Sequence, residues 1–124
     1  MPVNFTEPPY SYFAPPGVVR VSPQALEMAR SFGRQVAHAG RSNRLVAFDW
    51  AFSRSIRRHV DEPMEELGPG LDLVCFECAQ VPSEAIHRVD GVAFAIKIPE
   101  EVYGPSAERL IDVDERAFSN LVLR

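Results

Sequence analysis

The dipeptide Asp90-Gly91 lies between two apolar runs, AIHRV (85–89) and VAFAIKI (92–98). Aspartate and glycine both tolerate the positive φ angles that a tight two-residue turn between antiparallel strands requires. The flanking runs are rich in β-branched and aromatic residues, as strands usually are. The sequence therefore predicts a β-hairpin centred on residues 90 and 91, and any fold of this chain must contain it.

A clear helical period follows Ser22-Pro23, where serine can cap a helix and proline suits its first turn. Apolar residues then recur at helical spacing as far as Val36, and Gly40 provides a stop. Most other apolar runs are short and resemble strands. We therefore expect an α+β domain, with one amphipathic helix over about 23–39 packed on a small and mainly antiparallel β structure.

The segment RLVAFDWAF (44–52) would, as a strand, carry apolar residues on both of its faces. This pattern is typical of a strand that is covered on both faces. For SRSIRRHVDE (53–62) two structures remain open: a continuing strand, which we favour, or a short helix capped by Asp49. Residues 62–70 are acidic and end in Gly-Pro-Gly, which predicts a loop with room for one helical turn. The other segments predict strands at VVRV (18–21), LDLVCFECAQV (71–81), RLIDVDE (109–115) and AFSNLVL (117–123), and a turn or short helix at PEEVYG (99–104).

The composition indicates one globular domain without a strong charge bias. The chain has 124 residues, of which 46% are hydrophobic, and this suits a single core. With 17 acidic and 13 basic residues the net charge is -4, so we expect neither nucleic acid nor an anionic membrane as a partner. The first residues do not resemble a secretory signal and no run is long enough to span a bilayer, so we expect a cytoplasmic protein.

Residues 1–17 contain two proline pairs around the aromatic residues Tyr10, Tyr12 and Phe13. Each proline removes an amide donor, so we expect neither a helix nor a central strand there. We interpret this segment as an N-terminal arm, followed by a single domain over 18–124. The three aromatic residues favour docking on the domain itself or on a neighbouring subunit. We expect a homodimer with the arm at or near its interface.

Four short motifs link these segments to a known family: Val21-Ser22 with Ala25 at the helix start, Asp90-Gly91-Val92 in the hairpin, Tyr103-Gly104 with Ile111-Asp112, and Phe118 with Asn120. In this pattern the chain resembles the HesB-like fold of the A-type iron-sulfur carriers. The motifs are structural and cover about half of the chain. The resemblance implies the fold of that family over residues 18–124.

The same resemblance implies that the usual activity is lost. The family holds its cluster on three cysteines, one in a Gly-Cys-Ser-Gly type loop and two in a C-terminal Cys-Gly-Cys. Here the first region is DWAFSRS (49–55), which has no cysteine, and the sequence given ends at LVLR (121–124), where the second motif would begin. Thiolates hold such clusters, so no family ligand carries over to this chain.

Cys75 and Cys78, the two cysteines of the chain, form a Cys-x-x-Cys spacing within an apolar run. A zinc site would need a tight turn between them and a second ligand pair, and a redox site would need a helix start. On a strand the two side chains leave opposite faces. We therefore favour buried or packed thiols over a metal site, although His87 in a neighbouring strand remains a possible third ligand.

The densest cationic run of the chain adjoins its single tryptophan, and its members are Trp50, Arg54, Arg57, Arg58 and His59. Arginines in such a cluster could hold a carboxylate or phosphate, so these five are our candidate ligand or partner-binding residues. The simpler alternative is that the arginines pair with the acidic segment that contains Glu62, Glu65 and Glu66.

These observations favour a non-enzymatic binding or assembly module, a HesB-like domain without cluster ligation that contacts another protein or itself. No catalytic motif, resident metal or cofactor is expected. Two alternatives remain open. The first is a metal or iron-sulfur handling protein that uses Cys75 and Cys78, and the second is an enzyme that binds a small anion through His59 and the neighbouring arginines.

Overall fold

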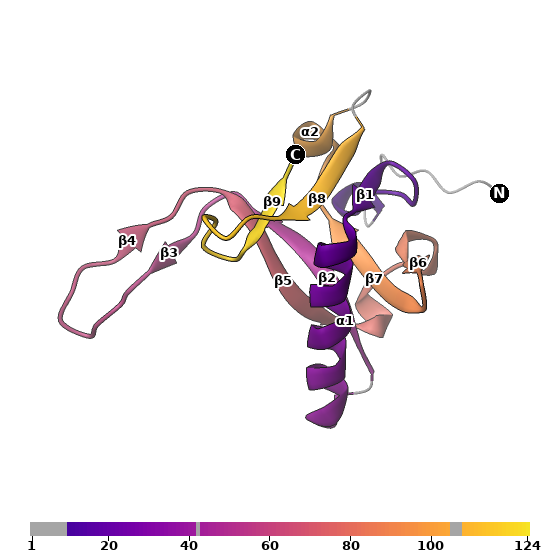
Figure 1. The fold of residues 1–124 in the computed structure, drawn as a ribbon, viewed down its shortest axis with the longest axis horizontal. Helices are drawn as coiled ribbons and strands as arrows, with labels where there is room; N and C mark the ends of the chain where they lie inside the picture. The colour runs from indigo at the N-terminus through magenta and orange to yellow at the C-terminus, as the bar shows by residue number, and fades with distance from the viewer. Residues whose placement is uncertain (1–9, 42, 105–107) are drawn as a thin grey trace.

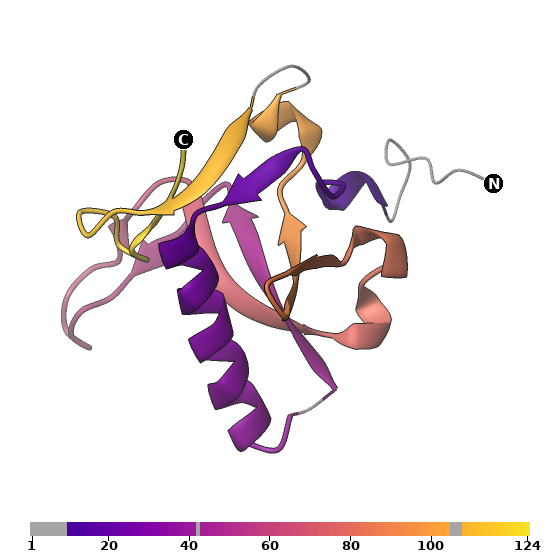
Figure 2. The ribbon, with the colours of Figure 1, turned by 45° about the vertical axis from the view of Figure 1, so that its right-hand side comes forward.

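The computed structural model describes residues 10–41, 43–104 and 108–124, which form an α+β fold (Figures 1 and 2). One long helix, one short helix and nine strands occur in these ranges. In chain order the elements are η1 (Tyr10–Tyr12), β1 (Val19–Val21), α1 (Pro23–His38), β2 (Arg44–Ala51), β3 (Ser55–Ile56), β4 (Glu65–Glu66), β5 (Gly70–Glu77), η2 (Cys78–Gln80), η3 (Ser83–Ala85), β6 (His87–Val89), β7 (Val92–Lys97), α2 (Glu100–Tyr103), β8 (Arg109–Val113) and β9 (Leu121–Leu123).

The strands form a four-stranded sheet, a three-stranded sheet and an isolated two-stranded hairpin. The larger sheet has the order β5-β2-β7-β6, with β2 antiparallel to β5 and parallel to β7. The smaller sheet has the order β1-β8-β9, in which β1 and β8 are parallel and β8 and β9 antiparallel. Among the strands of the described ranges, β3 and β4 pair with each other and with no third strand. The pairings are mainly antiparallel, as expected.

Helix α1 begins and ends where the sequence predicted. The Ser22 hydroxyl accepts a hydrogen bond from the Ala25 amide at 3.1 Å, and Pro23 is the first helical residue. The helix ends at His38, and Gly40 follows with φ +80°. A residue in this left-handed region just past a helix is the usual helix stop, and glycine adopts it without strain.

The predicted hairpin at Asp90-Gly91 is also confirmed. Strands β6 and β7 pair antiparallel, with Val89 opposite Val92, so only two residues lie in the turn. Asp90 has φ 49° and Gly91 has φ 80°. Two consecutive positive φ angles are typical of a type I′ turn, whose twist matches that of the flanking strands.

Strand β2 is covered on both faces, as its sequence predicted. Val46 and Phe48 face the main core, which they share with helix α1 and with residues of the three-stranded sheet. Leu45 and Ala47 face a second, smaller core on the opposite side of the sheet. Figure 2 shows α1 lying across one face of the larger sheet. Successive residues of a strand point to opposite faces, so both cores are built from one apolar run.

The N-terminal arm packs on its own domain from Phe13 onwards. Phe13 is buried in the second core, and the Ala14 amide donates to the Ile96 carbonyl at 2.8 Å. Contrary to our expectation that the arm contains no helix, Tyr10–Tyr12 form one turn of 3-10 helix. This turn precedes Pro15-Pro16 and ends in a hydrogen bond from the Phe13 amide to the Tyr10 carbonyl, so the prolines do not interfere with it. The first nine residues of the arm lie outside the described ranges.

The hairpin β3–β4 projects from the body of the molecule (Figure 1). The sequence left open a continuing strand or a short helix over 53–62; the structure has a strand of two residues, Ser55–Ile56, and no helix there. The acidic segment predicted as a loop contributes the partner strand, Glu65–Glu66. Pairing stops after two residues because this polar stretch offers no continuous apolar face to bury.

None of the helices in the described ranges is both long enough and apolar enough to cross a bilayer.

Candidate functional site

Trp50, near the end of β2, borders two hollows of the molecular surface. Its ring packs edge-on against Phe52, with ring centroids 6.5 Å apart and ring planes at 85°. The indole Nε1–H is the one buried side-chain donor in the described chain without a hydrogen-bond partner. Such an unpaired group costs about 1–3 kcal/mol, so the surroundings of Trp50 are not fully optimised for the isolated chain.

The first hollow, of about 430 Å³, brings together the arm, the end of β2 and the segment that follows β7. It is lined by Ser11, Tyr12, Trp50, Phe52, Lys97, Pro99 and Glu101. Tyr12 is 52% exposed and Phe52 is 60% exposed. We call Tyr12, Trp50 and Phe52 the aromatic surface. Aromatic rings with a polar rim are typical of protein contact sites.

The second hollow, of about 510 Å³, is lined by Trp50, by the base of the hairpin and by the connection between β8 and β9. Leu67 and Pro69 line it from the hairpin side, and Phe118 lines it from the connection. Phe118 is 55% exposed. The hydroxyl of Ser119 donates to the Leu71 carbonyl and thereby attaches this connection to β5. Each of the two hollows at the base of the hairpin is therefore lined by an exposed aromatic side chain, Phe52 in the first and Phe118 in the second.

Arg54 anchors the base of the hairpin to the body of the molecule. Its guanidinium lies 3.1 Å from the Asp72 carboxylate and donates to the Gly68 carbonyl at 3.2 Å. The Arg54 side chain is only 14% exposed. A Cβ at Gly70 would overlap this guanidinium, so glycine at position 70 makes room for it. Arg54 is therefore engaged within the chain and is not available to an external anion.

The other cationic candidates lie along the hairpin and do not converge. Arg58 pairs with Glu65 at 2.9 Å, as the simpler alternative supposed. Arg57 has no ion pair within the described residues. The His59 carbonyl accepts from the Glu62 amide in the turn of the hairpin. The structure therefore brings Trp50 and Arg54 to the base of the hairpin and leaves Arg57, Arg58 and His59 further out.

Two ion pairs lie side by side on the sheet beside this base, Arg54 with Asp72 and Lys97 with Asp49. Asp49 lies opposite Asp72 on the neighbouring strand and 3.9 Å from the Lys97 ammonium. Burial and the Asp72 charge raise the pKa of Asp49, and Lys97 acts in the opposite direction. The two aspartates repel each other, and each is compensated by its own cation, Asp72 by Arg54 and Asp49 by Lys97. Their evident role is to fix the start of the hairpin.

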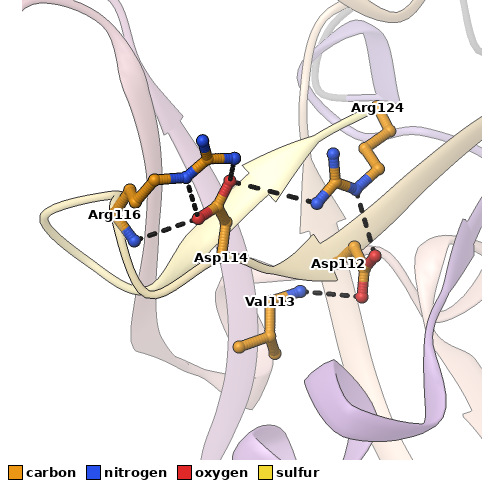
Figure 3. Close-up of polar contacts among 5 residues, drawn as sticks. All are labelled: Asp112, Val113, Asp114, Arg116 and Arg124. Carbon is orange, nitrogen blue, oxygen red and sulfur yellow. Dashed lines mark hydrogen bonds and ion pairs between the residues drawn. The ribbon is translucent and has the colours of Figure 1, made fainter.

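A second polar cluster fixes the connection between β8 and β9 (Figure 3). The Asp112 carboxylate accepts from the Val113 amide at 2.8 Å and from Arg124 at 3.0 Å, and these bonds, together with the Ser22 hydroxyl, lower its pKa. The Asp114 carboxylate accepts from the Arg116 side chain and amide, which lowers its pKa. Arg124 also lies 4.0 Å from Asp114. The cluster holds the connection that carries Phe118.

Cys75 and Cys78 do not lie on one strand. Strand β5 ends at Glu77, and Cys78 begins the 3-10 turn η2, where the Glu77 amide donates to the Gln80 side chain at 3.0 Å. The predicted strand over 71–81 is therefore too long, because this capping interaction interrupts it. Cys75 is half-buried and Cys78 is exposed, and both are free. No group of three metal-binding side chains occurs among the residues described.

His87 lies three strands away from Cys75, contrary to our placement of it in a neighbouring strand. Strands β5 and β6 form opposite edges of the larger sheet, with β2 and β7 between them. Three strand spacings correspond to about 14 Å. The His87 Nε2 lies 3.1 Å from the Ala14 carbonyl and the ring stacks on Phe94. His87 therefore serves the core and the docking of the arm.

The sequence grouped Trp50 with the cationic run, and the structure places it beside two surface hollows. The sequence did not identify Phe52 and Phe118, which line these hollows. Both are apolar residues within short segments that otherwise read as strands, so their spacing indicated burial. Their exposure follows from the end of β2 at Ala51 and from the turn that precedes β9 at Leu121. Aromatic residues at the ends of predicted strands, beside polar stretches, were the available signal.

Comparison with known proteins identifies no relative: no family model matches the chain, and neither a curated protein nor a solved structure is significantly similar to it. The HesB-like resemblance therefore stays a prediction.

Proposed function

We propose that this chain is a non-enzymatic binding or assembly module, which contacts another protein or a second copy of itself through the hairpin β3–β4 and the aromatic surface at its base. The proposal depends on where the large apolar side chains are exposed. Six such side chains occur among the described residues: Tyr12, Phe52, Val60, Met64, Val89 and Phe118. All except Val89 lie on the hairpin or line the hollows at its base. Clustered exposed apolar groups mark contact sites for other macromolecules.

The hairpin itself supports a role in binding. Its two strands pair over two residues each, and its tip carries Val60, which is 88% exposed. An isolated two-stranded hairpin is marginally stable in water. A partner that covers its apolar side chains would stabilise it, because burying apolar surface is favourable.

We also propose that the module is a HesB-like domain that has lost cluster ligation. The capped helix α1 and the hairpin β6–β7, which carry two of the four motifs of the resemblance, support this assignment. The region in which the family has its first cysteine holds Phe52 and Arg54 here. Both belong to the base of the projecting hairpin, so this region would serve protein contacts in place of a cluster.

The experiment compares the full chain with Phe52→Asp and with Val89→Asp, which places the same charge on an exposed apolar residue far from the hairpin. Sedimentation velocity of labelled protein gives the native mass, both for the purified chain and in a lysate of its native cells. We expect a mass above the 13.9 kDa monomer in at least one condition. Phe52→Asp should abolish the larger species while leaving the far-UV circular dichroism spectrum unchanged.

Val89→Asp should retain the larger species. A wild-type chain that sediments as a monomer in both conditions would contradict the proposed function. If both variants lose the larger species to the same extent, the contact surface lies elsewhere.

A further inference from the structure

The charges of the projecting hairpin are sorted along its sequence. Residues 54–59 contain the basic side chains Arg54, Arg57, Arg58 and His59, and residues 61–66 contain the acidic side chains Asp61, Glu62, Glu65 and Glu66. The first arm of the hairpin, which includes β3, is therefore basic, and the second arm, which includes β4, is acidic. A surface that carries both signs side by side can be complementary to itself.

Only some of these charges are neutralised within the chain. Arg54 pairs with Asp72 in the body of the molecule, and Arg58 pairs with Glu65 across the hairpin. Arg57, Asp61, Glu62 and Glu66 have no ion pair or side-chain hydrogen bond with any residue that the structure describes. Unpaired charges of both signs therefore remain on the hairpin.

The register of the hairpin assigns these charges to its two faces. Ser55 lies opposite Glu66, and Ile56 lies opposite Glu65. Arg57 and Met64 each lie one residue beyond the paired strands. Continuing the alternation of side chains by this one residue assigns Arg57 to the face of Ser55 and Met64 to the face of Glu66. We call Ser55, Arg57, Met64 and Glu66 the open face. Arg57 and Glu66 have no ion pair with any described residue, and Met64 is 52% exposed.

The opposite face differs, because it carries the Arg58–Glu65 ion pair. The charges of this opposite face are already paired within one chain. A charged partner would therefore bind it less favourably than it binds the open face. The open face is thus the side of the hairpin on which a partner would find both an apolar side chain and unmatched charges.

We propose that the open face packs on the open face of a second copy of this chain, related by a twofold axis parallel to the length of the hairpin. This inference rests on the proposed function and identifies the partner. In this arrangement the basic arm of each hairpin lies over the acidic arm of the other. Arg57 then lies over the partner's Met64 and within reach of the partner's Glu66, which is two residues, about 7 Å, along the strand.

The charge pattern selects this arrangement over other symmetric ones. A twofold axis perpendicular to the length of the hairpin would place the basic arm on the basic arm. Edge-to-edge pairing of two copies of β3, or of two copies of β4, would also bring like charges together. Like charges directly opposed are destabilising, whereas an isologous interface requires one surface that is complementary to itself.

The test uses sedimentation equilibrium of the purified full chain, with reductant present because Cys78 is an exposed free thiol. We expect a dimer that weakens as the salt concentration rises. Arg57→Glu and Glu66→Arg should each weaken dimerisation by about tenfold or more, since each places like charges together. The double variant Arg57→Glu, Glu66→Arg should restore it. Arg20→Glu changes an exposed arginine outside the hairpin and should have no effect.

Three results would overturn the inference: a monomeric wild-type chain, a dimer that is insensitive to both single substitutions, or a folded double variant that stays monomeric. The proposed function fails separately. If the purified chain is a monomer but forms a Phe52-dependent larger species in the lysate, the binding module stands and its partner is a different protein.

Discussion

The stability of the fold should decrease as the pH falls below about 6.5, the ordinary pKa of histidine, because His87 is buried in its neutral form. The side chain lies in β6 with 6% of its surface exposed, and it stacks on Phe94 with ring centroids 5.2 Å apart. Burial lowers the pKa of His87, and the hydrogen bond with the Ala14 carbonyl opposes this shift without cancelling it. The cause is the loss of water around the charged imidazolium.

The sign follows from proton binding in the two states. In the unfolded chain His87 takes up a proton near pH 6.5, whereas the folded chain does so only at lower pH. Between these two pKa values the unfolded state binds more protons, so the free energy of unfolding falls as the pH falls. One proton corresponds to a slope of about 1.4 kcal/mol per pH unit. Above the unfolded pKa this contribution is complete and constant.

Urea unfolding followed by circular dichroism, at one protein concentration, measures the slope between about pH 7.5 and about pH 5. His87→Gln keeps an N–H donor for the Ala14 carbonyl but cannot be protonated, so its slope should be smaller by up to about 1.4 kcal/mol per pH unit. His59→Gln, an exposed histidine on the hairpin, should retain the wild-type slope. A wild-type stability that is constant over this range, or a slope unchanged in His87→Gln, would refute the reasoning.

Three glycines give further predictions, all measured by urea unfolding. Gly91→Val should cost about 1–3 kcal/mol, because Gly91 has φ +80° although a Cβ there would meet no neighbour; an unchanged stability would contradict the turn assignment. Gly70→Ala should cost about 1–2 kcal/mol because the new methyl group displaces the Arg54 guanidinium from its charge-assisted bonds. Gly33→Ala should stabilise the chain by up to about 1 kcal/mol, since alanine favours the helix and its Cβ would lie 3.4 Å from the Val46 side chain. A loss of stability in Gly33→Ala would show that this contact is too tight.

The elements that the sequence predicted well are those whose signals are local. Ser22-Pro23 and Gly40 mark the two ends of α1, and Asp90-Gly91 supplies the two positive φ angles of its turn. Apolar residues at both odd and even positions of β2 predicted a strand covered on both faces. In each case the decisive interaction joins residues close in sequence or follows from the alternation of one strand.

The strand order could not be predicted in this way. We placed His87 beside the strand of Cys75, but β2 and β7 lie between them. The order of strands in a sheet depends on which strands pack around the same core. The sequence indicates only that each strand has an apolar face. The short capping interaction between Glu77 and Gln80, which ends β5 before Cys78, was equally hidden because both residues are compatible with a strand.

The candidate site was only partly predictable. Trp50 was identified from its position beside the cationic run, but the hollow beside it is assembled from three distant segments, represented by Tyr12, Phe52 and Lys97. The arginines were grouped by sequence, whereas the fold directs Arg54 toward Asp72 and separates it from the rest. Contacts between distant segments decided both outcomes.

The central claim is that the chain binds its partner, a second copy or another protein, through the projecting hairpin. Hydrogen–deuterium exchange of the full chain, alone at low concentration and again in its assembled form, tests this claim most directly. Covered amides exchange more slowly because binding restricts their opening. We predict that assembly slows exchange in residues 53–66 more than in β6, which lies at the opposite edge of the larger sheet from β5. Unchanged exchange in the hairpin, with protection confined to other strands, would contradict the account.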